Sequence, residues 1–282
     1  MKHLFITDMD GTLLGPDSRV SPESAAIITD LSKRGALITV ATARTPATVE
    51  PLLHNALTTI PAIVLTGAAM WDRRSMRFMD PLMLTADKAM ALEEAFIGHG
   101  IDPFVYNLRA DGHMEVWHSA ILSEVEQKFY SARNALDLKK FIFADPPHCS
   151  ASPASPAILM LGIGSTDRIG KLAGYLRTDP GLSISAYPDL FDPGLSYIEV
   201  FRAGVSKAAA VLRLKEMLGA DRVTVYGDHL NDLPMFAVAD ESVAVANALP
   251  EVLEAATRVI GPNTLPSVAL DIASNFQSDS SL

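Results

Sequence analysis

Acidic residues follow two apolar segments of this 282-residue chain. The first segment, Leu4–Thr7, runs into Asp8–Thr12, and the second, Arg222–Tyr226, is followed by Asp228 and Asp232. Two carboxylates about 4 Å apart repel each other by roughly 4 kcal/mol at an effective dielectric constant near 20. A cation or a shared proton should therefore accompany them. An Asp-Gly pair is also common in ordinary turns, so the first segment alone leaves both interpretations open.

Both acidic segments are expected at the carboxyl ends of buried parallel strands. An apolar run bounded by turn residues is typical of such a strand, and open α/β sheets bind ligands at that edge. If the strand at 222–226 lies beside the strand at 4–7, it brings together Asp8, Asp10, Asp228 and Asp232. Clustered carboxylates favour a hard cation, and Mg²⁺ is the leading candidate.

The remainder of the core is expected to alternate strands and helices. A helix should begin at Ser21-Pro22 and stop at Gly35, the strand 36–41 should deliver Thr42 and Arg44 to the same edge, and a third strand should cover 60–65. Near the C-terminus, Ser206 is expected to cap a helix that begins with Lys207. Strands near 243–245 and 259–260, a helix from about 265 to 276 and a polar tail at 277–282 complete this half.

The segment between these halves predicts a separate α+β module. A hairpin at 69–80 precedes helices near 85–98, 122–136 and 167–177, strands near 104–106, 114–117, 158–162 and 196–201, and a loop at 146–156. Helices are expected on one side of its sheet. We expect an α/β fold with a doubly wound, Rossmann-like parallel-sheet core, residues 1–80 plus 204–282, and an inserted α+β cap domain, residues 81–203. Such a module can act as a lid; an independent domain with its own ligand is the alternative.

Composition limits the possible partners. The chain carries a formal charge of -10 and has a pI near 5.1. Because an acidic surface does not attract nucleic acid or an anionic membrane, neither is expected as a partner. Cys149 is the single cysteine, which excludes an intramolecular disulfide. The first strand follows Met1–His3 directly, which leaves no room for a signal peptide and predicts a cytoplasmic protein.

The motifs, taken in chain order, resemble those of the haloacid dehalogenase superfamily of phosphohydrolases. The resemblance rests on Asp8-x-Asp10-Gly11-Thr12, Thr42, Lys207 and Gly227-Asp228-x-x-Asn231-Asp232. More narrowly, the chain looks like the Cof-type subgroup, which carries a large, type IIB-like cap. It departs from that subgroup at Ala43, where Thr-Gly-Arg is usual, and at Thr66, where Asn-Gly is usual.

The resemblance implies a role for each motif residue. Asp8 is the expected nucleophile, and Asp10 is the expected general acid and base, which requires a raised pKa that crowding by other carboxylates could supply. Mg²⁺ would be held by Asp8, the Asp10 backbone carbonyl and Asp228. Thr42 and Lys207 are the expected phosphate ligands, and the residues expected nearby are Gly11, Thr12, Ala43, Arg44, Asn231 and Asp232.

The sequence therefore predicts a Mg²⁺-dependent phosphatase that hydrolyses a small phosphate monoester, such as a sugar or polyol phosphate, through an aspartyl-phosphate. A dehalogenase is disfavoured because those relatives lack the second acid, here Asp10. A phosphotransferase or phosphomutase would keep every motif residue and stays open. A non-catalytic protein that binds a phosphate ligand should have lost a catalytic acid, and none is missing.

Overall fold

The computed structural model describes residues 1–144, 157–189 and 192–279, and it divides into two compact units. The core unit comprises Met1–Met79 and Ser206–Leu282, and the inserted unit comprises Asp80–Val205. The loop expected at 146–156 lies outside the described residues. Within the described ranges, no helix is both long enough and apolar enough to cross a membrane.

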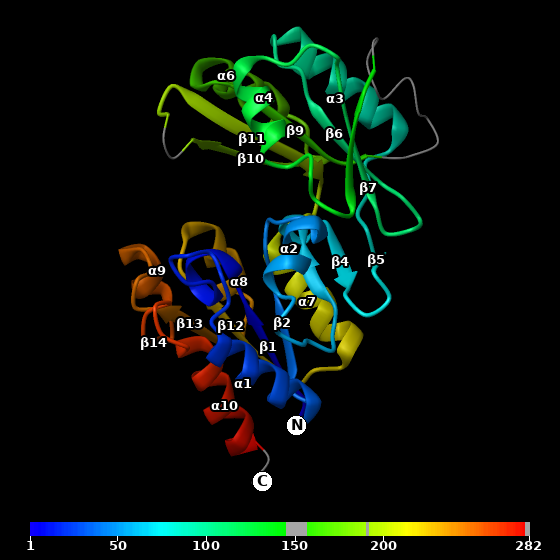
Figure 1. The fold of residues 1–282 in the computed structure, drawn as a ribbon. Helices are drawn as coiled ribbons and strands as arrows, with labels where there is room; N and C mark the ends of the chain where they lie inside the picture. Colours follow the sequence, from blue (N-terminus) through cyan, green and yellow to red (C-terminus); the bar gives the residue numbers. More distant parts are fainter. Residues whose placement is uncertain (145–156, 190–191, 280–282) are drawn as a thin grey trace. The chain divides into compact units, whose positions relative to one another are not determined.

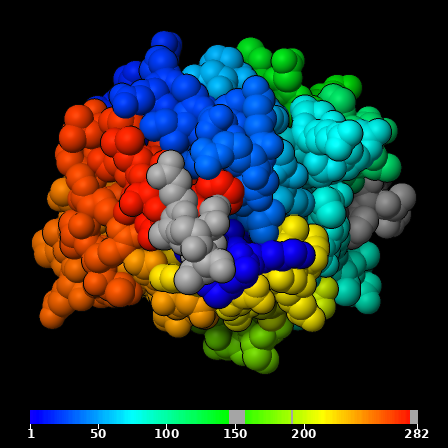
Figure 2. Space-filling view, turned by 90° about the horizontal axis from the view of Figure 1, so that it is seen from below, coloured from blue at the N-terminus to red at the C-terminus, as the bar shows by residue number. Residues whose placement is uncertain are grey.

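A five-stranded parallel sheet forms the centre of the core unit, with strand order β14-β13-β12-β1-β2 (Figure 1). Its strands are β1 (His3–Thr7), β2 (Leu37–Val40), β12 (Arg222–Gly227), β13 (Glu241–Val245) and β14 (Arg258–Ile260). The pairing of β1 with β12 confirms that the strand after the long insertion returns beside the first strand. Figure 2 accordingly shows blue N-terminal segments next to orange and red C-terminal ones.

Helices cover both faces of this sheet. They are α1 (Pro22–Lys33), α2 (Pro46–Leu52), α7 (Lys207–Leu218), α8 (Leu233–Phe236), α9 (Pro250–Ala255) and α10 (Ser267–Asp279). The chain moves outward from the centre in opposite directions, from β1 to β2 and from β12 to β14, so right-handed crossovers place the two sets of helices on opposite faces. Consistently, α1 packs against α10, and α8 packs against α7 and α9. The core is therefore doubly wound, as the sequence predicts.

Side-chain caps start two of the predicted core helices, α1 and α7. The Ser21 hydroxyl accepts a hydrogen bond from the Ser24 backbone N–H at 3.1 Å, and the Ser206 hydroxyl accepts one from Ala209 at 3.0 Å. Gly35, with φ of +95°, follows the end of α1. Each cap satisfies a backbone donor that the first turn of a helix leaves without an intrahelical partner. The last helix runs to Asp279, beyond the end predicted from the sequence.

The third predicted strand forms a different sheet from the one expected. β3 (Ala62–Val64) meets the core sheet through a parallel bridge, but pairs along its length with antiparallel β4 (Ala69–Asp72), which pairs with β5 (Arg77–Met79). A tight turn, Leu65–Gly67, joins β3 to β4 with positive φ at all three residues. A Cβ at Gly67 would lie 2.4 Å from the Ser206 carbonyl oxygen, so glycine permits this turn to approach the start of α7.

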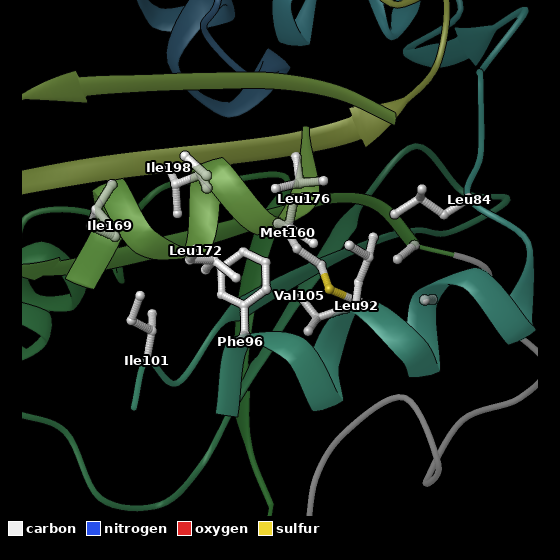
Figure 3. Packing of buried hydrophobic residues seen from close by; sticks show 14 residues of the cluster. Leu84, Leu92, Phe96, Ile101, Val105, Met160, Ile169, Leu172, Leu176 and Ile198 are labelled. Carbon is white, nitrogen blue, oxygen red and sulfur yellow. The ribbon is translucent and has the colours of Figure 1, made fainter. Parts of the chain in front are cut away.

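The inserted unit is built on a six-stranded sheet with order β10-β11-β9-β6-β7-β8. The strands are β6 (Phe104–Leu108), β7 (Met114–His118), β8 (Lys139–Phe143), β9 (Ala157–Ser165), β10 (Leu182–Pro188) and β11 (Leu195–Arg202). On one face, α3 (Ala86–Gly98) and α6 (Thr166–Leu176) bury an apolar cluster (Figure 3). In this cluster, Phe96 and Leu172 meet Val105, Met160 and Ile198 of the sheet.

The prediction that helices lie on one side of this sheet is wrong. α4 (Glu124–Ser131), shorter than the predicted 122–136, packs its Phe129 ring 4.8 Å from the ring of Phe104. Phe104 and Val105 are neighbours on one strand and therefore point to opposite faces. Because Val105 belongs to the cluster beneath α3 and α6, α4 covers the other face. Strands β8 and β10 were also not predicted.

Candidate active site

Two neighbouring strands deliver the first acidic residues to one edge of the core sheet. Thr7 pairs with Tyr226, and the backbone N–H of Asp8 donates to the Tyr226 carbonyl at 2.9 Å. Asp8 comes directly after β1, and Asp228 comes directly after β12. This register brings both residues to the same edge, as the sequence predicts.

Three carboxylates gather there. One oxygen each from Asp8, Asp228 and Asp232 lies within 4.8 Å of the other two. Asp8 and Asp232 are buried, and Asp228 is half-buried. With the ammonium of Lys207 among them, three carboxylates against one cation leave two negative charges uncompensated. The charge and the hard oxygen donors fit a divalent cation such as Mg²⁺.

Lys207 places its ammonium between two of these acids. Its Nζ donates to Asp8 Oδ1 and, at 2.7 Å, to Asp232 Oδ1. The residue is 2% exposed and is the first residue of α7, where the helix macrodipole disfavours a cation. The two buried carboxylates provide the compensation that this position needs.

Backbone groups fix the orientation of Asp232. Its Oδ2 accepts hydrogen bonds from the backbone N–H groups of Asp228 at 3.1 Å and His229 at 3.2 Å. A Cβ at Gly227 would lie 2.7 Å from the Asp232 Cβ, so the close approach requires glycine. The Asn231 side chain is exposed, and the contacts that hold Asp232 come from Lys207 and the backbone instead. A positioning role for Asn231 stays a prediction.

The segment after Asp8 wraps around Asp228. The Thr12 hydroxyl donates to Asp228 Oδ1 at 2.7 Å, and Gly11 adopts a φ of +81°. A Cβ at Gly11 would lie 2.2 Å from Asp228 Oδ2, so both the backbone conformation and the space available require glycine there.

Asn247, which was not predicted from the sequence, also belongs to this edge. Its side-chain N–H donates to the Gly11 carbonyl at 2.8 Å, and its Oδ1 accepts from the Asn263 backbone N–H at 2.8 Å. Asn247 follows shortly after β13, which ends at Val245. A polar residue near the carboxyl end of a parallel strand is a signal that could have identified it.

The structure does not place the Asp10 side chain in the carboxylate cluster. Both Asp10 oxygens instead accept from Arg44, Oδ2 from Nε at 2.7 Å and Oδ1 from Nη2 at 2.5 Å. The four-carboxylate cluster expected from the sequence is therefore a three-carboxylate cluster. The expectation that other carboxylates crowd Asp10 is wrong, because its side chain points to a guanidinium across the edge.

Thr42 lies at the same edge, just beyond β2. Its side chain is buried, and its hydroxyl oxygen accepts from the Arg44 backbone N–H at 3.1 Å. Its carbonyl accepts from the Thr66 N–H at 3.0 Å, which ties the turn after β3 to this segment. Ala43 is exposed between Thr42 and Arg44. The Thr42 hydroxyl can therefore donate a hydrogen bond to a bound ligand.

Burial and mutual repulsion shift the pKa values of the clustered groups. Burial raises the pKa of Asp8 to about 7 against the opposing effect of Lys207, and the charges of Asp232 and Asp228 add to the rise. Burial also raises the pKa of Asp228. Burial lowers the pKa of Lys207, but Asp8 and Asp232 outweigh it, and the net pKa is raised. The cluster is therefore short of positive charge.

A family model describing haloacid dehalogenase-like hydrolases matches residues 5–272. The chain belongs to this family. The resemblance carried by the motifs is confirmed over nearly the whole length of the chain. The parallel core with additional sheets matches the fold of solved family members, and the chain is a phosphohydrolase of the haloacid dehalogenase type.

Three curated relatives cover most of the chain. A 5-amino-6-(5-phospho-D-ribitylamino)uracil phosphatase of Bacillus subtilis is 25% identical over 93% of this chain and 94% of its own length. An HMP-PP phosphatase of Serratia proteamaculans is 28% identical over 89% of this chain and 86% of its own. A pyridoxal phosphate phosphatase of Escherichia coli is 23% identical over 95% and 97%. All three names describe phosphatases of small phosphate compounds.

Solved structures match the fold at low sequence identity. A haloacid dehalogenase-like hydrolase from Bacteroides thetaiotaomicron superimposes with a TM-score of 0.78 at 20% identity, covering 98% of this chain and 100% of that one. A subclass IIB sugar phosphatase superimposes with a TM-score of 0.70 at 16% identity, covering 98% and 99%. At these identities the likeness establishes the fold alone.

Proposed function

We propose that the protein is a Mg²⁺-dependent phosphatase that transfers the phosphoryl group of a small phosphate monoester to Asp8 and then to water. The observation that carries the proposal is the setting of the Asp8 carboxylate. It is buried at the end of β1, bonded to Lys207 and grouped with two further carboxylates, so that three carboxylates share the one ammonium of Lys207. Bound Mg²⁺ would supply further positive charge, lower the carboxylate pKa values and neutralise the transferring phosphoryl group.

Asp8 is the proposed nucleophile. One carboxylate oxygen attacks phosphorus, a bond forms between that oxygen and phosphorus, and the bond to the leaving alkoxide breaks. Lys207 holds the carboxylate in position and faces the negative charge of the phosphoryl group. The Thr42 hydroxyl donates a hydrogen bond to a phosphate oxygen. Asp8, the Asp10 carbonyl and Asp228 would hold the cation.

Asp10 is the proposed general acid and base. It protonates the leaving alkoxide and later takes a proton from the water that attacks the aspartyl-phosphate. Both oxygens of its carboxylate accept from Arg44, so at least one must be released before Asp10 can carry a proton. The contact between Asp10 and Arg44 is therefore proposed to be a resting arrangement that substrate breaks.

A small sugar or polyol phosphate is the proposed substrate class. The curated relatives are named for a phospho-D-ribitylamino uracil, HMP-PP and pyridoxal phosphate, and one structural relative is named a sugar phosphatase. The chain's charge of -10 gives no basic track for a polyanion. Ala43 and Thr66 depart from the subgroup pattern close to the site, so the preferred ester can differ from that of any one relative.

The inserted unit is proposed to close over bound substrate, with residues 81–203 moving about chain crossings near 80–81 and 203–204. Two short crossings permit hinge motion and restrict twist. X-ray scattering profiles recorded with and without beryllofluoride should differ. Identical profiles would contradict closure.

A panel of phosphate esters tests the proposed function. Hydrolysis of hexose phosphates, polyol phosphates, pyridoxal phosphate, nucleotides and a phosphopeptide is compared by kcat/KM, with Mg²⁺ and with a chelator. We expect Mg²⁺-dependent hydrolysis that favours sugar or polyol phosphates. A tenfold preference for a nucleotide or phosphopeptide, about 1.4 kcal/mol in the transition state, would contradict the substrate class. Full activity in the chelator would contradict the metal.

A further inference from the structure

Lys139 of β8 is a buried cation in the inserted unit. It is 8% exposed, and no residue in the described ranges forms a hydrogen bond or an ion pair with its ammonium. Its Nζ lies 5.4 Å from the centre of the ring of Tyr106, which belongs to β6 of the same sheet. The aromatic face attracts a cation, but it does not replace the hydrogen-bond acceptors that a buried ammonium loses with water.

A second cation lies beside it. Arg133 follows α4, and its guanidinium lies over the Phe129 ring at 4.1 Å and donates to the Phe129 carbonyl at 3.3 Å. Burial, together with a smaller contribution from the charge of Arg133, lowers the pKa of Lys139 to about 8. Among the described residues, Arg133 has no carboxylate within ion-pair distance. The two positive charges are close enough to repel each other, and neither has a counter-ion among the described residues.

Glu199, a carboxyl group on the same face of the sheet, does not neutralise Lys139 and Arg133. Glu199 of β11 lies on the same side of the sheet as Phe104 and Tyr106, through its pairing with Leu161. Its Oε1 accepts from the Tyr187 hydroxyl at 3.2 Å, and burial raises its pKa to about 7. Glu199 is therefore occupied by a phenol, and burial disfavours its charge.

An uncompensated buried lysine beside a second, half-buried cation is unusual in a chain with ten more acidic than basic residues. An oxyanion would accept hydrogen bonds from both cations and supply the missing charge. We propose that Lys139 and Arg133, beside the Tyr106 ring, bind the phosphate or carboxylate group of a small molecule. This oxyanion site is formed by residues of the inserted unit alone and does not depend on the proposed function.

Competitive acylation tests the site in the whole protein. The rate at which a small amine-selective acylating reagent modifies Lys139 is measured by peptide mass spectrometry in chloride, inorganic phosphate, sulfate and acetate at equal ionic strength. We expect phosphate to slow modification of Lys139 at least threefold. Lys140, its exposed neighbour on β8, is the internal control and should react at an unchanged rate.

Two variants separate this site from other sources of protection. Arg133→Met should abolish the protection of Lys139 by phosphate, and Thr42→Val, which alters the phosphate site beside Asp8, should retain it. Protection by acetate as well as phosphate would identify a site that also accepts carboxylates. Equal rates in all four salts would overturn the proposal. Complete resistance of Lys139 to the reagent would also overturn it, because no ligand could then reach the ammonium.

Discussion

The protein buries two lysines in opposite electrostatic surroundings. Lys207 in the core unit donates to Asp8 and Asp232, and these two acids raise its pKa in spite of burial. Lys139 in the inserted unit has no acidic partner among the described residues, and burial together with Arg133 lowers its pKa to about 8. Burial alone therefore does not define the role of a lysine. The first ammonium organises carboxylates, whereas the second is left to be neutralised by a ligand.

Removing each ammonium should change stability in opposite directions, and Lys207 should give the larger effect. Lys207→Met leaves two buried carboxylates without their cation, which is expected to lower the free energy of unfolding by about 3–5 kcal/mol. Urea denaturation in a chelator measures the change. Lys215→Met in the same helix is the control, because the Lys215–Asp240 pair is partly exposed and should contribute less than about 1 kcal/mol. Equal losses in both variants would contradict the account.

Lys139→Met should instead stabilise the protein. Replacing an uncompensated buried cation by an apolar side chain of similar length is expected to raise the free energy of unfolding by about 1–4 kcal/mol at neutral pH. Lys140→Met is the matched control and should change it by less than about 0.5 kcal/mol. A loss of stability in Lys139→Met would indicate that the ammonium is satisfied in the folded protein.

The effect of Lys139 should depend on pH. The folded pKa is lowered from 10.5 to about 8, so between these values the unfolded chain binds more protons and stability rises with pH. The destabilisation by Lys139 is fully present below pH 8 and is relieved as pH approaches 10.5, by about 3 kcal/mol in all. The stability difference between Lys139→Met and the wild type should shrink over this range. A constant difference would contradict the lowered pKa.

Removing one acid from the cluster of Asp8, Asp228 and Asp232 should have a smaller effect, which is measured as Mg²⁺ affinity. Asp228→Ala removes one carboxylate of three and should weaken Mg²⁺ binding at least tenfold, about 1.4 kcal/mol by calorimetry. Asp221→Ala, which changes an acid before the start of β12, should leave the affinity unchanged. Unchanged affinity in Asp228→Ala would show that the metal site is misassigned.

The sequence predicted the parts of the site that strand direction determines. Asp8 and Asp228 end apolar strands, and parallel pairing had to bring them to one edge. It did not predict that Asp10 turns to Arg44, because that choice depends on side-chain geometry across the edge. β8 was missed because it begins with two lysines, Lys139 and Lys140, and only three apolar residues follow, although Lys139 is buried. The face covered by α4 depends on tertiary packing that periodicity does not encode.

Trapping of the phosphorylated residue tests most directly whether Asp8 receives the phosphoryl group. Enzyme turning over an activated phosphate ester with Mg²⁺ is quenched in acid and reduced with borohydride, which converts an aspartyl-phosphate to homoserine. The peptide is then sequenced by mass spectrometry. Asp8→Asn, which should lose at least about 10⁴-fold in kcat, serves as the blank. We expect homoserine at position 8 in the wild type alone. Conversion at position 10, or none in enzyme that is turning over, would contradict the mechanism.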